Sequence, residues 1–274
     1  MSDSSLLDTP NNKLQTKVTQ WQLVLLAISF LTRIPVALRF NVTNTHLNQA
    51  SRYFALVGLL LGGLLALSYC VFQLLLPPSL SVLLMMAFGL LLTGAFHEDG
   101  WADVWDGFGG GWQVEQKLTI MKDSRLGTYG AAALFIILLI KFQSLVLLST
   151  SLTAIITAIL LGQCLSRVIA TSLIVSMDYV SEDATSKVKP IAMYLSFNSL
   201  AILTLTAVIL LLSLIFLNII VWQTAVIIIA VLLILRSVLV RWFKRQLGGY
   251  TGDCLGAAQQ LSEVIIYLTL VGLL

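Results

Sequence analysis

Residues 53–76 read YFALVGLLLGGLLALSYCVFQLLL, an uninterrupted apolar run that ends at Pro77 and Pro78. An α-helix needs roughly 20 apolar residues to cross the hydrocarbon core of a bilayer, so this run is long enough to span a membrane. Residues 80–96 form a second, somewhat shorter apolar run directly after the prolines. Together the two runs predict a hairpin of antiparallel membrane helices.

The pattern of apolar runs continues to the end of the chain. The further runs are residues 129–149, 152–177, 197–217, 221–240 and 256–274. Composition agrees, because 58% of the residues are hydrophobic and only 11% are charged, against about 25% charged in soluble domains. The runs are also too continuous for barrel strands. We therefore expect an all-α, polytopic transmembrane bundle of about seven spans, between roughly six and eight.

The N-terminal region differs from these runs. Residues 21–38 are apolar but contain Arg33 and Pro35, so we expect an interfacial or re-entrant helix there. The preceding residues are polar and lack the pattern of a cleavable secretory signal. No linker or change of composition divides the rest of the chain. We expect a polar cytoplasmic tail at residues 1–20 and a single integral membrane catalytic domain at residues 21–274.

The basic residues next to the predicted spans all fall on one side of the membrane. Because cytoplasmic loops of membrane proteins carry the excess of Lys and Arg, this side and the N-terminus are predicted to be cytoplasmic. The net charge of +3 reflects this asymmetry and does not indicate nucleic-acid binding. The residues concerned are Lys13, Lys17, Arg39, Arg52, Lys117, Lys122, Arg125, Lys187, Lys189, Arg241, Lys244 and Arg245.

A cluster of acids follows the second apolar run, on the predicted cytoplasmic side. Residues 97–111 read HEDGWADVWDGFGGG, with four acids and no Lys or Arg. In a helix, Asp99, Asp103 and Asp106 would share one face, where like charges repel unless a cation lies between them. Carboxylates without imidazole or thiolate partners suit Mg²⁺ or Mn²⁺. The sequence predicts a metal site of Asp99, Asp103 and Asp106 supported by Glu98; the alternative is a solvated acidic loop.

Cationic and polar residues downstream are candidates for phosphate binding. Lys122, Ser124 and Arg125 would complement a phosphate or diphosphate held beside a metal ion, although positive charge at this place also serves as a topological anchor. Arg167 falls inside the run 152–177, so we expect it to face the bundle interior, where it would reach substrate phosphates or pair with an acid. Lys141 is similarly deep and is expected to snorkel or to form an ion pair.

Three further kinds of residue complete the candidates. Asp253 lies in GGYTGDCLGA, at the cytoplasmic start of the last run, and is a candidate metal or substrate ligand. His97 would be able to assist chemistry, but a single histidine at the end of a span more often has a structural role. The cysteines Cys70, Cys164 and Cys254 are far apart, which indicates neither a disulfide framework nor a zinc site.

Five motifs in order resemble the cobalamin synthase family, the adenosylcobinamide-GDP ribazoletransferases. They are FLTRIPV at 30–36, HEDGWADVWDGFGGG at 97–111, KDSRLGTYGA at 122–131, LSRV at 165–168 and GDCLGA at 252–257. The resemblance implies a bacterial inner-membrane enzyme. It would move the adenosylcobinamide phosphate moiety of adenosylcobinamide-GDP to the 3′-hydroxyl of α-ribazole, or of its 5′-phosphate, with release of GMP.

The resemblance also implies roles for the candidate residues. Asp99 and Asp103 would bind Mg²⁺, and Mn²⁺ is a second candidate. Asp106 would bind metal or accept the hydroxyl proton, so Asp103 and Asp106 are the predicted catalytic residues. Lys122, Arg125 and Arg167 would hold the diphosphate. The acidic motif is also similar to that of CDP-alcohol phosphotransferases, but it lacks their alanine-arginine step between the early and late aspartates.

Two other functions remain open from the sequence. One is a phosphotransferase that joins a nucleotide-activated headgroup to a lipid alcohol, which would use the same cluster. The other is a cation-coupled transporter, which should carry ionisable residues at matching depths in two repeated halves. Here the acids lie at one membrane face, which disfavours a transport path. The sequence also leaves open whether the chains form a homo-oligomer.

Overall fold

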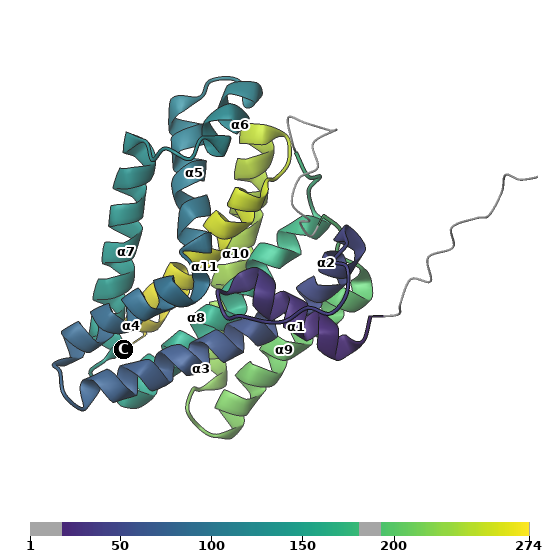
Figure 1. Cartoon of the computed structure of the whole chain (residues 1–274). Helices are drawn as coiled ribbons and strands as arrows, with labels where there is room; N and C mark the ends of the chain where they lie inside the picture. Colours follow the sequence, from purple (N-terminus) through teal and green to yellow (C-terminus); the bar gives the residue numbers. More distant parts are fainter. Residues whose placement is uncertain (1–17, 181–192, 274) are drawn as a thin grey trace, which may run out of the picture.

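A computed structural model describes residues 18–180 and 193–273. Lys13, Lys17, Lys187 and Lys189, on which the predicted orientation partly rests, lie outside these residues. The described residues are helical apart from their connections (Figure 1). The elements are α1 (Gln20–Leu31), α2 (Asn44–Ala50), η1 (Ser51–Tyr53), α3 (Phe54–Gln73), α4 (Pro78–Thr93), α5 (Phe96–Gly110), α6 (Val114–Lys122), α7 (Thr128–Leu148), α8 (Leu152–Ser172), η2 (Leu173–Val175), α9 (Phe197–Phe216), α10 (Trp222–Leu247) and α11 (Gly252–Val271).

Six of the described helical segments are long and apolar enough to cross a membrane, and α4 with α5 would make a seventh. The prediction of an all-α, multi-pass membrane protein is therefore confirmed. Helix α1 has 12 residues and falls below the length of a span. Helix α10 continues to Leu247, through residues that the sequence placed in a basic loop, and ends at Gly248 with a left-handed φ of 79°.

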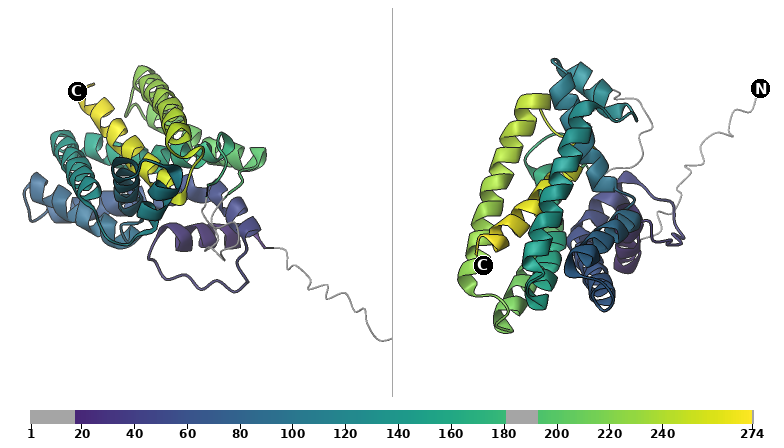
Figure 2. Two further views of the ribbon diagram at one scale, coloured as in Figure 1. Left: turned by 90° about the horizontal axis from the view of Figure 1, so that it is seen from above. Right: turned by 90° about the vertical axis from the view of Figure 1, so that its left-hand side faces the viewer.

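Helices α8 and α11 form the centre of the bundle. Helix α3 packs along α8, whereas α5 packs along α11 and beside α7. Helices α7, α9 and α10 are less buried and carry exposed apolar side chains that suit contact with lipid. Figures 1 and 2 show α5 and α7 side by side, with α6 at one end of the molecule and the C-terminus toward the other.

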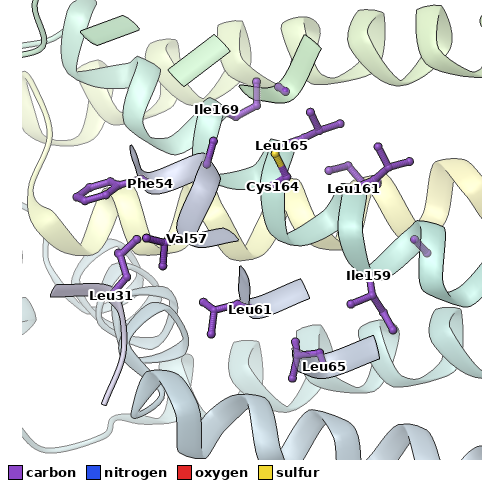
Figure 3. Packing of buried hydrophobic residues seen from close by; sticks show 14 of the residues in the cluster. Leu31, Phe54, Val57, Leu61, Leu65, Ile159, Leu161, Cys164, Leu165 and Ile169 are labelled. Carbon is purple, nitrogen blue, oxygen red and sulfur yellow. The ribbon is translucent and has the colours of Figure 1, made fainter. Parts of the chain in front are cut away.

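The contact between α3 and α8 depends on small residues. A Cβ atom on Gly58 would lie 2.2 Å from the Gln163 carbonyl oxygen, so only glycine permits this approach of the two backbones. Figure 3 shows apolar side chains of the same cluster, among them Leu61 and Leu65 of α3 and Leu161 and Cys164 of α8. Cys164 and Cys254 are buried free thiols, consistent with the absence of a predicted disulfide framework.

A sharp break separates α4 from α5. Gly94 and Ala95 both adopt left-handed backbone conformations, with φ of 66° and 55°, and the two helices bend by 87°. The backbone N–H of Arg33 donates to the Leu92 carbonyl oxygen at 2.7 Å, so the segment after α1 packs on this break. The break directs the acidic residues of α5 toward α11.

Candidate active site

Helix α5 carries the acidic cluster, which confirms the helical spacing assumed from the sequence. The helix extends over Phe96–Gly110, so Asp99, Asp103 and Asp106 follow one another along one side. Asp99 is exposed, Asp103 is partly buried and Asp106 is buried. The three carboxylates therefore differ in their access to solvent, and their surroundings differ as well.

Asp253 joins Asp99 and Asp103 through a close crossing of α5 and α11. A Cβ on Gly100 would lie 2.9 Å from the Asp253 carbonyl oxygen, and one on Gly256 would lie 3.4 Å from the Gly100 Cα. The crossing brings the Asp253 carboxylate close enough to those of Asp99 and Asp103 for mutual repulsion. None of the three forms an ion pair within the described part of the chain.

This group is incomplete as a metal site made of protein alone. Among the described residues, no three His, Cys, Asp or Glu side chains converge closely enough to hold a metal ion. Mg²⁺, however, is commonly bound by only one or two carboxylates, with waters and substrate phosphates completing its octahedron. Asp99, Asp103 and Asp253 offer hard oxygen ligands of this kind on two rigid helices.

Asp106 has a different environment, because both of its carboxylate oxygens accept backbone hydrogen bonds. Gly127 N–H donates to Oδ2 at 2.7 Å and Gly130 N–H donates to Oδ1 at 2.8 Å. A Cβ on Gly127 or Gly130 would lie 2.4 or 2.3 Å from these oxygens, so both positions need glycine. Asp106 thus binds the N-terminus of α7, where unpaired N–H groups and the helix dipole favour a negative charge.

Glu98 is turned about 100° around α5 from Asp99 and lies in a buried polar network, whereas Asp99 is exposed. Its Oε1 accepts from Gln260 Nε2 at 3.0 Å, while Oε2 has no partner among the described residues. Gln259 connects Gln260 to Glu263, which forms an ion pair of 2.7 Å with Lys141. The structure thus confirms the pairing of Lys141 and places Glu98 apart from Asp99 and Asp103.

The cationic loop between α6 and α7 lies on the surface. Lys122, Ser124 and Arg125 are exposed, and Arg125 is paired with Asp123. The Arg125 guanidinium donates to both Asp123 oxygens and lowers the pKa of that carboxyl to about 2. Asp106 holds the end of this loop against α5 through Gly127. The loop is therefore fixed near the acids, although its side chains point outward in this structure.

Arg167 lies inside the bundle, as predicted, and lines a pocket beside the acids. The pocket has a volume of about 240 Å³ and contains Asp99, Asp253 and His97 in its wall. Arg167 is 2% exposed, and its Nη1 donates to the Gln163 carbonyl oxygen at 2.7 Å and to Gln163 Oε1 at 2.9 Å. His97 is buried and packs edge-on against Phe96.

Comparisons with known proteins show the family of the chain. A sequence model of the family described as cobalamin-5-phosphate synthase matches residues 23–271. The chain belongs to this family. A relative from Vibrio cholerae, named adenosylcobinamide-GDP ribazoletransferase, is 50% identical over 255 residues, which cover 93% of this chain and 95% of the relative.

Two Shewanella relatives with the same name give a similar result. Those from Shewanella frigidimarina and Shewanella piezotolerans are each 51% identical over 253 residues, covering 92% of this chain and 95% of the relative. No solved structure matches the chain. The resemblance that rested on five short motifs thus extends over nearly the whole chain.

The structure groups the predicted residues differently from the sequence. The sequence indicated Asp253 only as an additional candidate and grouped Asp106 and Glu98 with the metal ligands. Gly127 and Gly130 lie three residues apart at the start of an apolar run. In the sequence, this spacing was the available signal that a carboxylate binds a helix N-terminus here. Only the packing of α5 against α7 shows which carboxylate occupies that place.

Proposed function

We propose that the chain transfers the adenosylcobinamide phosphate moiety of adenosylcobinamide-GDP to the 3′-hydroxyl of α-ribazole, or of its 5′-phosphate, with release of GMP. One observation carries the proposal. About half of the residues are identical, over nearly the full length of the chain, to those of proteins named for this reaction. The site supports it, since carboxylates on two helices, exposed at Asp99 and partly buried at Asp103 and Asp253, lie beside a pocket and a cationic loop.

We further propose that the enzyme uses Mg²⁺, with Mn²⁺ as a substitute. Asp99, Asp103 and Asp253 would hold the ion, because they repel one another and have no ion-pair partner in the described residues. When bound, the ion would neutralise charge on the substrate diphosphate. Glu98, which lies behind Asp99 in the polar network, would support α5 and would not touch the ion.

The proposed reaction is a displacement at the phosphorus that carries cobinamide. The 3′-hydroxyl oxygen forms a bond to this phosphorus, while the bond from phosphorus to the bridging oxygen breaks and that oxygen leaves with GMP. The hydroxyl proton passes to a carboxylate, for which Asp103 is better placed than Asp106 because both Asp106 oxygens accept backbone bonds. Asp106 would instead act as a positioning residue for the cationic loop.

The cationic loop would bind the leaving nucleotide. Lys122 and Ser124 are exposed beside the acids, and Arg125 would exchange Asp123 for a phosphate oxygen when the diphosphate arrives. Such groups stabilise the charge that develops on departing GMP. The basic residues of this loop and of the α10 end would face the cytoplasm of a bacterial inner membrane, with a cytoplasmic N-terminus.

Turnover by membranes containing the protein tests the proposal. Adenosylcobinamide-GDP, either acceptor and Mg²⁺ should give a cobalamin product and GMP, and chelator should stop the reaction. Asp103→Asn and Asp253→Asn should each lower kcat by about 10²-fold or more while the protein stays folded. Asp123→Asn is the control, because it makes the same substitution on the exposed loop. It should lower kcat much less than Asp103→Asn or Asp253→Asn does.

Two results would contradict the proposal. Retained activity in folded Asp103→Asn would remove Asp103 from the reaction. No product from folded wild-type protein with either acceptor would make transfer to a lipid alcohol the leading function, because that chemistry would use the same carboxylates and loop.

A further inference from the structure

The segment that follows η2 pairs with the turn between α10 and α11, directly before Asp253. Tyr179 of this segment forms an isolated parallel bridge with Tyr250 of the turn. We propose that the Tyr179 hydroxyl donates a hydrogen bond to a phosphate oxygen of the donor diphosphate. The inference rests on the proposed function and adds a donor-binding residue that lies in none of the five sequence motifs.

Backbone hydrogen bonds fix the place of Tyr179, because the residues on either side of it bond to Tyr250. The Val180 N–H donates to the Tyr250 carbonyl oxygen at 2.8 Å, and the Tyr250 N–H donates to the Asp178 carbonyl oxygen at 3.0 Å. Tyr250 precedes Asp253 by three residues, and Asp253 lies in the first turn of α11. The bridge therefore holds Tyr179 beside the start of α11.

Side-chain packing holds the ring of Tyr179 as well. The ring meets that of Tyr250 edge-on, with centroids 5.6 Å apart and an angle of 77°. Tyr250 is fully buried, whereas Tyr179 is half-buried. A Cβ on Gly249 would lie 2.2 Å from the Asp178 carbonyl oxygen, so only glycine permits this close approach of the two segments. The ring of Tyr179 is thus fixed on one side and open on the other.

The Tyr179 hydroxyl is within electrostatic reach of charges of both signs. Burial and the Asp253 carboxylate raise the pKa of this hydroxyl, and Lys122 acts in the opposite direction. The hydroxyl forms no hydrogen bond with another residue of the described ranges. Because a phenol keeps its proton at neutral pH, the hydroxyl can donate this proton to an anionic ligand.

A diphosphate is the anion that would meet this hydroxyl. The proposed ion would be held partly by Asp253, and Lys122 belongs to the loop proposed to bind the leaving nucleotide. Donor phosphates that contact both would lie beside Tyr179, where a hydroxyl forms a charge-assisted hydrogen bond with a phosphate oxygen. The acceptor attacks from the side opposite to the leaving group, so Tyr179 would not contact it.

Steady-state kinetics of the full-length protein in lipid vesicles test this assignment. With saturating acceptor, Tyr179→Phe should raise the donor KM about tenfold. It should leave kcat unchanged, because the bond is made both before and during transfer. Acceptor KM should not change. Tyr250→Phe is the matched control and should keep the wild-type donor KM, since the buried Tyr250 hydroxyl has no hydrogen-bond partner among the described residues.

Two results in this experiment would overturn the proposal. One is an unchanged donor KM in Tyr179→Phe. The other is an equal rise of the donor KM in Tyr250→Phe, which would show that the paired rings act only through packing.

Pyrophosphate with Mg²⁺ tests which part of the donor the hydroxyl contacts. Pyrophosphate should compete with the donor, and Tyr179→Phe should raise its inhibition constant about as much as the donor KM. A raised donor KM with an unchanged inhibition constant would place the contact on the base or on cobinamide and contradict the proposal. Absence of competition in the wild type would contradict it too.

Direct binding separates failure of this inference from failure of the proposed function. If wild-type protein gives no turnover with either acceptor, the proposed function fails. Thermal unfolding with GDP and Mg²⁺ then tests the contact alone. Stabilisation of the wild type that is kept in Tyr250→Phe and reduced in Tyr179→Phe supports the contact. Equal stabilisation of all three proteins, or none, contradicts it.

Discussion

Asp106 illustrates, for a single residue, how a carboxylate in an acidic motif can serve structure and not metal binding. Asp106→Asn would keep one acceptor oxygen but turn an NH₂ group toward the second backbone N–H. An unsatisfied buried group of this kind costs about 1–3 kcal/mol, so we expect lower thermal stability. The Mg²⁺ concentration for half-maximal activity should stay unchanged, whereas Asp99→Asn should raise it. Wild-type stability together with a raised Mg²⁺ requirement would return Asp106 to the metal site.

The same contact can be tested from the side of the glycines. A methyl group on Gly130 would lie 2.3 Å from Asp106 Oδ2 and 2.8 Å from the Ala102 carbonyl oxygen. Gly130→Ala should therefore displace Asp106 and the cationic loop, and lower both stability and kcat. Gly63→Ala meets open space and is the matched control, expected to keep activity. Equal behaviour of the two variants in unfolding and turnover assays would contradict the role assigned to Asp106.

Between elements, the crossing of α5 and α11 decides whether the carboxylates meet. Gly100→Ala would bring a methyl group within 2.9 Å of the Asp253 carbonyl oxygen and 3.0 Å of its Cα, so the helices would have to separate. Because catalytic geometry is sensitive to shifts of about 1 Å, we expect kcat to fall by roughly 10²-fold. Gly110→Ala lies on the same helix, where the new methyl would contact only Ile120 at 3.4 Å, and should remain active.

The elements also show what the sequence can predict. Hydropathy was sufficient to predict the membrane-spanning helices. The spacing of Asp99, Asp103 and Asp106 was sufficient to predict that they lie along one side of a helix. The contacts of Gly100 with Asp253 and of Asp106 with α7 depend on how distant helices pack, which local patterns do not contain. Lys141 is intermediate, because its depth indicated either snorkelling or an ion pair, and the packing of α7 against α11 shows the pair with Glu263.

For the whole molecule, the buried pair of Lys141 and Glu263 connects the outer helix α7 to the central helix α11. Glu263 also accepts hydrogen bonds from Gln163 at 2.7 Å, Tyr267 at 2.8 Å and Gln259 at 2.9 Å, so it joins α8 to the same network. The Glu263 side chain is 1% exposed. Its negative charge therefore depends on Lys141 for compensation inside the membrane domain.

Removing one partner of this pair should destabilise the bundle far more than removing both. Lys141→Met would leave the Glu263 charge buried and uncompensated, at a cost of about 3–5 kcal/mol. Lys141→Met combined with Glu263→Gln should recover part of this loss, because no unpaired charge remains. Arg125→Met removes an exposed ion pair and should leave unfolding unchanged. Unfolding in detergent micelles measures all three, and a Lys141→Met protein as stable as the wild type would show that the pair does not hold α7 to α11.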